Sequence, residues 1–234
     1  MTAYFAGLFA ALVSGYWFIL KPPASRRWIS LFLAAGGAYL IAILFTHIIP
    51  ELVTELPDSA GKLMLTGFLI QILLENYSKG IEHGHAHGSK SKTAFYLAFG
   101  ALCVHAFIEG MPLSGWLTGR ESGAYYRLLA GIMAHKIPVA ITLATLMTTL
   151  GMKKTTGMVL LTLFIAATVA GTIFQLQLHT IAGAEKMLHI AIALTVGILL
   201  HVSTTILFES SDEHKLSPSR IAVIAVGVAL GVLL

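Results

Sequence analysis

The sequence predicts an all-α membrane protein with eight transmembrane helices, which form one polytopic domain over residues 1–234. Two observations favour this fold class. Hydrophobic residues make up 56% of the chain and charged residues only 11%, whereas a soluble domain carries about 25% charged residues. The apolar residues also gather in long runs, and a membrane-spanning helix needs about 20 such residues. A chain this poor in charge could not cover a surface in water, so its solvent must be lipid.

Eight apolar runs define the predicted helices. They cover approximately residues 3–20, 28–56, 60–81, 93–117, 124–150, 155–178, 186–209 and 218–234. The segments between them are short, and none has room for a soluble domain. Residues 79–92 form a histidine-rich loop between the third and fourth helices.

Lysine and arginine predict the orientation, because they accumulate on the cytoplasmic side of membrane proteins. One set of alternating loops holds ten of them: Lys21, Arg26, Arg27, Lys79, Lys90, Lys92, Lys153, Lys154, Lys215 and Arg220. The other set holds four: Lys62, Arg120, Arg127 and Lys186. The first set is therefore expected inside. Both termini then lie outside, and the histidine-rich loop is cytoplasmic.

Ionisable residues inside the predicted helices are candidates for function, because they are costly to place in a bilayer. His47 and Glu51 stand four apart in the second run, and His105 and Glu109 stand four apart in the fourth. This spacing puts both side chains of a pair on one helix face. The fifth run adds His135 near its centre. Imidazole and carboxylate ligands suit Zn²⁺, Fe²⁺, Mn²⁺ or Co²⁺, so these residues are expected to bind a divalent metal.

Further histidines extend this pattern. His201 lies near the middle of the seventh run and is either another metal ligand or a polar contact between helices. His83, His85 and His87 stand in the glycine-containing loop. Short histidine-rich tracts bind metals, so this loop is expected to capture metal transiently, the alternative being a solvated linker.

Prolines follow the candidate ligands closely. Pro50, Pro112 and Pro138 each leave the carbonyl four residues earlier without its helical partner. The freed oxygens belong to Thr46, Ile108 and Ala134. Each stands next to a candidate ligand, in a region where unpaired backbone is tolerated only inside protein or a wet cavity.

Together these motifs resemble the ZIP (Zrt/Irt-like) family of divalent metal transporters. The matching segments are 46–51, 67–75 with the histidine loop, 105–110 and 134–138. The resemblance implies a metal site between the fourth and fifth helices, often binuclear, and carries the ligand roles to His105, Glu109 and His135. It also implies a homodimer and an elevator-like movement of one helix group against another.

The chain departs from the family pattern beside these ligands. Ala106 replaces the usual asparagine, Val139 the second glutamate and Ala140 the following glycine. Lys136 lies near the bilayer centre, where it costs about 2.5–3.5 kcal/mol on insertion scales, and Glu109 is its nearest expected partner. The hypothesis is that the Lys136 ammonium substitutes for the second metal ion. The chain is then a single-metal branch of the family, or its transport is altered or lost.

The leading functional hypothesis is transport of a divalent metal from outside into the cytoplasm, through the bacterial inner (plasma) membrane. Zinc is expected first, with Fe, Mn, Co or Cd as further substrates. One alternative is a relative that senses metal without transporting it, and another is a membrane haem protein with His105 and His135 as axial ligands. No enzymatic activity is expected, since the sequence lacks the His-Glu-x-x-His string of a zinc protease. No basic–aromatic pattern indicates a nucleic-acid partner.

Overall fold

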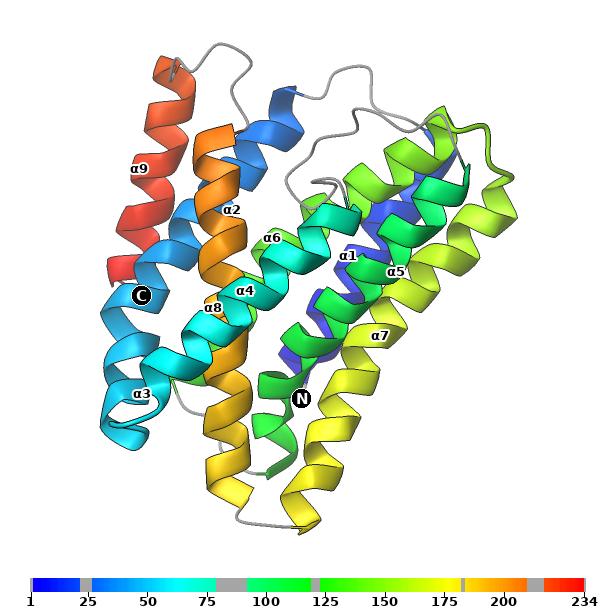
Figure 1. Cartoon of the computed structure of the whole chain (residues 1–234). Coiled ribbons are helices and arrows are strands. Elements are labelled where there is room, and N and C mark those ends of the chain that lie inside the picture. The colour runs from blue at the N-terminus through cyan, green and yellow to red at the C-terminus, as the bar shows by residue number, and fades with distance from the viewer. Residues whose placement is uncertain are drawn as a thin grey trace.

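The computed structural model describes residues 2–21, 27–78, 92–118, 123–181, 184–209 and 217–233. The predicted capture residues His83, His85 and His87 lie outside these ranges. The described chain is helical (Figure 1). Its elements are α1 (Thr2–Leu20), α2 (Arg27–Ile43), the π-helical turn η1 (Leu44–Ile48), α3 (Ile49–Glu55), α4 (Ala60–Ser78), α5 (Lys92–Gly110), the 3₁₀ helix η3 (Met111–Thr118), α6 (Gly123–Thr149), α7 (Lys154–Ile181), α8 (Ala184–Glu209) and α9 (Pro218–Leu233).

Helices stand at all eight predicted runs, since α2, η1 and α3 follow one another without a break, as do α5 and η3. Within the described residues, six are long and apolar enough to cross a membrane. The other two are α4, whose polar residues lower its mean hydropathy, and α9. With 16 residues, α9 is about 24 Å long, against about 30 Å of hydrocarbon. The count of eight spans and the side on which the termini lie stay predictions.

The outer surface of the bundle is apolar, as the composition predicts. Phe9, Leu97 and Phe208 are 68%, 61% and 75% exposed. Glu109 and Lys136, in contrast, are buried. Large apolar side chains outside and charged ones inside are the pattern expected of a protein whose solvent is lipid.

Two of the predicted prolines coincide with changes of helix type. Pro50 is the second residue of α3, which directly follows the π-helical turn, and Pro112 lies in the 3₁₀ helix that continues α5. Pro138 lies inside α6, which continues through it. Pro112 cannot donate to the carbonyl of Ile108, and the Thr195 hydroxyl of α8 does so instead, at 3.1 Å. A neighbouring helix thus satisfies backbone that a proline has freed, as a membrane interior requires.

The helices pack in two groups. α1 lies against α6 and α5 against α7, and these four form the α5 group. α2 lies against α9 and α4 against α8, and these four form the α8 group. Figure 1 shows α2, α8 and α9 on the left and α5 and α7 on the right. Across the boundary α2 meets α6 and α4 meets α5, so any site on α5 and α6 lies beside the α8 group.

Glycines allow the paired helices to touch backbone to backbone. In the α8 group, Gly67 of α4 faces the carbonyl of Leu194, and Gly197 of α8 faces the carbonyl of Met64. In both places a Cβ would overlap the opposing backbone. Small residues that let helices approach closely are typical of membrane interfaces, where dispersion contacts drive association.

The pair of α5 and α7 uses the same arrangement. Gly110 faces the carbonyl of Thr168, and Gly171 faces that of Phe107. Between the groups the approach is softer, since Gly131 of α6 meets the flexible end of the Leu40 side chain in α2. The closest backbone approaches are therefore within the groups, while between the groups Gly36 of α2 lies near the backbone of Ala134 in α6, where a Cβ would be 3.2 Å from the carbonyl oxygen.

Gly67→Ala is expected to destabilise the protein by about 1–3 kcal/mol, because the new methyl group overpacks the α4–α8 contact. The matched control is Gly61→Ala in the same helix, where a Cβ meets nothing within 4 Å. Thermal unfolding of the purified protein in detergent measures both. Equal melting temperatures for the two variants would contradict the close packing of α4 on α8.

Candidate metal site

Two helices of the α5 group build a cluster of metal-ligand side chains. α5 supplies His105 and Glu109, which share one face because they stand four apart. α6 supplies His135. All three are at most 2% exposed, and one ligand atom from each lies within 4.8 Å of the others. In the described ranges this is the one group of three or more His, Cys, Asp or Glu residues that could hold a metal ion.

Gln71 of α4 fixes the hydrogen of His105. Its amide oxygen Oε1 lies 2.9 Å from Nδ1 of the imidazole, and both side chains are buried. An amide oxygen only accepts hydrogen bonds, so Nδ1 is the donor in this contact, and in the neutral imidazole Nε2 then keeps its lone pair. A histidine that binds metal through one nitrogen commonly donates from the other in this way.

The Nε2 lone pair of His105 faces the carboxylate of Glu109. Nε2 and Oε1 are 3.1 Å apart, which is an ion-pair distance if the imidazole is protonated, and neither atom has a well-aligned hydrogen bond to any of the described residues. Two buried acceptors this close repel one another unless a cation lies between them. With ligand bonds of about 2.0–2.1 Å, 3.1 Å corresponds to an angle of about 100° at the ion, which is near tetrahedral. This geometry suits a zinc-sized ion.

Lys136 of α6 holds the other oxygen of the same carboxylate. Its Nζ donates to Oε2 of Glu109 at 2.8 Å, and both side chains are about 1% exposed. The ammonium also lies 4.9 Å from the centre of the Phe164 ring, a favourable cation–π distance. The sequence predicts this contact between Lys136 and Glu109, and the structure confirms it. Glu109 therefore has an ammonium on Oε2 and the imidazole of His105 beside its buried Oε1.

His135 completes the cluster from the opposite side. Its ring meets that of His105 edge to face, with centroids 6.0 Å apart. Two imidazoles and one carboxylate oxygen provide three ligands, and a fourth tetrahedral position stays available for water or another group, as in zinc sites that exchange ligands. The cluster could thus hold a metal ion and leave a position for an exchangeable ligand.

His47 and Glu51 lie away from this cluster, on η1 and α3. His47 is partly buried, and its Nε2 is shielded from solvent without a hydrogen bond among the described residues. Glu51 is exposed. The structure therefore does not bring this pair together with His105, Glu109 and His135, and their metal-binding role stays a prediction.

His201 lies in a different contact, between α8 and α4. Its Nδ1 is 3.2 Å from Oε2 of Glu75, and its ring meets Phe68 edge to face at 4.9 Å. This pair links two helices of the α8 group and does not belong to the buried cluster. Both the ligand role and the interhelical role predicted for His201 are compatible with this position.

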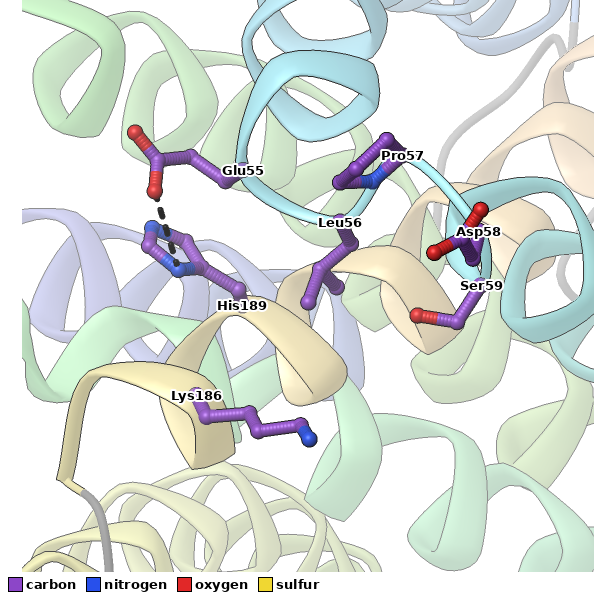
Figure 2. A pocket seen from close by; sticks show the side chains of 7 residues that line it. All are labelled: Glu55, Leu56, Pro57, Asp58, Ser59, Lys186 and His189. Atoms are coloured by element: carbon purple, nitrogen blue, oxygen red, sulfur yellow. Dashed lines mark ion pairs between the residues drawn. The ribbon is translucent and has the colours of Figure 1, made fainter.

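A pocket of about 560 Å³ lies where the turn between α3 and α4 meets the start of α8. Figure 2 shows the Glu55 carboxylate beside the His189 ring, with Asp58 and Ser59 across the pocket. Glu55 Oε2 and His189 Nδ1 are 4.0 Å apart. Sequence analysis does not single out these residues, nor Gln71, because each stands outside the paired spacing that identifies the cluster.

The structure thus combines a bundle of apolar helices with a buried cluster of two histidines and a glutamate that could hold a metal ion, the pattern of a membrane protein with a candidate metal site. The comparisons agree with this class. The model of the ZIP zinc transporter family matches residues 76–234, about two thirds of the chain, including all three cluster residues. A comparison with curated proteins finds no match. The chain belongs to the ZIP zinc transporter family, whose members transport divalent metals and are not enzymes. The predicted resemblance is confirmed.

Proposed function

We propose that this protein carries zinc, or a related divalent cation such as Fe²⁺, Mn²⁺, Co²⁺ or Cd²⁺, across the plasma membrane into the cytoplasm. The observation that carries the proposal is the convergence of His105, Glu109 and His135, which lie within 4.8 Å in the interior of a ZIP-family chain. Their ligand types suit these borderline metals. The open fourth position supports exchange rather than permanent storage.

The site is proposed to hold one ion, with Lys136 in the place of a second. Glu109 would bind the metal through Oε1 while Oε2 keeps its hydrogen bond to Lys136, as a carboxylate bridges two cations. The charges of Glu109 and Lys136 cancel, so the empty site is neutral. A neutral site attracts a dication less than an anionic one, which favours release over tight retention.

A route to this site is proposed along η1 and α3. His47, Glu51 and Glu55 stand at successive four-residue intervals along this continuous helix, and Glu55 borders the pocket with His189. Glu75 lies toward the opposite end of α4, where it contacts His201 of α8. Metal would enter at the pocket, bind in the cluster, and leave past His201; the capture role of His83, His85 and His87 stays a prediction.

Uptake into proteoliposomes tests the function. The purified full-length protein is reconstituted with a metal-responsive dye inside, and Zn²⁺, Fe²⁺, Mn²⁺, Co²⁺ and Cd²⁺ are added separately. Saturable uptake above protein-free vesicles is expected, with zinc among the substrates. Binding of metal in detergent without uptake of any of the five would instead identify a sensor-like relative.

The arrangement of the His105 and His135 rings argues against the haem alternative. Two axial histidines lie on opposite faces of a porphyrin, whereas His105 and His135 meet edge to face, and both share the surroundings of Glu109 and Lys136. A Soret band in the purified protein would contradict this conclusion.

The orientation is tested by cysteine labelling in a Cys103→Ala background. The charge bias predicts that cysteine at Ser59 reacts with an impermeant maleimide in intact cells and that cysteine at Ser89 does not. Ser59 borders the proposed entry pocket, and Ser89 belongs to the histidine-rich loop. Lysed cells provide the control, since Ser89→Cys should then react. The reverse pattern would place the pocket inside and the loop outside.

A further inference from the structure

We propose that Gln71 is a positioning residue that keeps His105 and Glu109 open to metal by holding the imidazole hydrogen on Nδ1. The proposal rests on the metal-binding role of the cluster and adds a residue that lies outside the family-matched range 76–234. Gln71 belongs to α4, whereas the ligands belong to α5 and α6. Its own atoms are not needed as metal ligands.

The geometry of the contact between Gln71 and His105 supports this role. Gln71 is fully buried, its Oε1 lies 2.9 Å from Nδ1 of His105, and the imidazole is also buried. In the bilayer interior no bulk water competes for the Nδ1 hydrogen. The amide oxygen therefore stabilises one of the two neutral tautomers of His105, and in that tautomer Nε2 presents a lone pair to the site.

The other tautomer would close the site. With its hydrogen on Nε2, His105 would face Oε1 of Glu109 at 3.1 Å, a distance that a small rotation turns into a charge-assisted hydrogen bond. The two atoms that point at the metal position would then be paired with each other. Metal could bind only after that bond had broken and the hydrogen had moved to Nδ1. By accepting a hydrogen bond from Nδ1, Gln71 disfavours the tautomer in which His105 and Glu109 would bind each other instead of the metal.

The same hydrogen bond crosses the boundary between the two helix groups. Gln71 lies in the α8 group and His105 in the α5 group, and the Thr195–Ile108 bond joins the groups one turn further along α5. Separation of α5 from α4 would withdraw the acceptor from Nδ1. The affinity of the cluster is therefore coupled to the docking of α5, with high affinity when Gln71 is in contact and lower affinity when it is not.

The test compares three variants of the full-length protein. Gln71→Met keeps the size but removes the acceptor, Gln71→Glu restores an acceptor, and Gln175→Met is the matched control. Gln175 of α7 is equally buried, and its amide has no hydrogen-bond partner in the described part of the chain. Nitrogen-15 NMR of histidine-labelled, metal-free protein reports the tautomer of His105, which is assigned by the resonance that His105→Ala removes. Competition with a chelating dye reports the affinity for Zn²⁺.

Wild type and Gln175→Met are expected to show the hydrogen on Nδ1 and the same affinity. Gln71→Met should move the hydrogen to Nε2 and weaken zinc binding by about 10–100-fold, the usual effect of losing such a partner. Gln71→Glu should restore both. An Nδ1 hydrogen and unchanged affinity in Gln71→Met would overturn the proposal. The tautomer is read without metal, so a wild-type protein that failed to bind or transport zinc would refute the proposed function through a separate measurement.

Discussion

His105→Ala is expected to weaken zinc binding at least 100-fold and to reduce uptake to the level of protein-free vesicles. The change removes the ligand at the centre of the cluster, which contacts Glu109 at 3.1 Å, Gln71 at 2.9 Å and the ring of His135. The remaining two ligands cannot enclose a tetrahedral ion. The Lys136–Glu109 pair stays intact, so the protein should remain folded in the membrane.

Glu109→Ala should lose binding as well, but with a second effect. It leaves the Lys136 ammonium buried without its partner, and breaking a buried ion pair costs about 3–5 kcal/mol. His105→Ala is therefore the cleaner test. His189→Ala is the control for binding in detergent, since it removes an imidazole from the proposed entry pocket and none from the cluster. Full binding and uptake by His105→Ala, measured with calorimetry and proteoliposomes, would refute the assigned site.

Lys136→Asn combined with Val139→Glu is expected to raise the metal content from one ion per chain to two. Val139 is buried one helical turn beyond His135, so a glutamate there would face the same region. The double change removes the ammonium that holds Oε2 of Glu109 and supplies a second carboxylate. Metal analysis of the dialysed protein measures the outcome.

Lys136→Met alone should tighten binding at least tenfold, because the site then carries the uncompensated charge of Glu109, and tenfold corresponds to only about 1.4 kcal/mol. Lys62→Met, at an exposed position of α4, should change nothing. If the double variant still binds one ion and Lys136→Met has wild-type affinity, Lys136 has no part in setting the stoichiometry.

Much of the fold could be predicted because each membrane-spanning helix needs a long apolar run, which is visible in the sequence. Each run of about 20 apolar residues forms helix. α5 together with η3 (92–118) matches the predicted run 93–117, and α8 (Ala184–Glu209) matches the predicted run 186–209, to within two residues at each end. The π-helical turn at Leu44–Ile48 could not be predicted, because it depends on how α2 packs against its neighbours. The division into two groups likewise depends on contacts between residues far apart in sequence.

In the candidate site, too, some residues could be predicted from the sequence and others could not. His105 and Glu109 are predictable because four-residue spacing is a local property of a helix, and Lys136 because a buried charge requires a partner. The sequence gives no comparable indication of Gln71. Burying an amide in the membrane costs less free energy than burying a charge, and Gln71 has no fixed sequence spacing to its partner. Its role depends on the contact of α4 with α5. The pairing of His201 with Glu75 was missed for the same reason.

The Lys136–Glu109 pair has a consequence for the energetics of the transport cycle. In the proposed transport cycle the empty site is neutral, so its return across the membrane would move no charge, and each loaded ion would move two. An inside-negative potential of 100 mV would then supply about 4.6 kcal/mol per ion, at about 2.3 kcal/mol per charge. Imposing such a potential on proteoliposomes with a potassium gradient and valinomycin should accelerate zinc uptake, and equal rates at zero potential would show that a counter-ion travels with the metal. The membrane potential alone would thus be sufficient to drive metal inward roughly a thousandfold against its gradient.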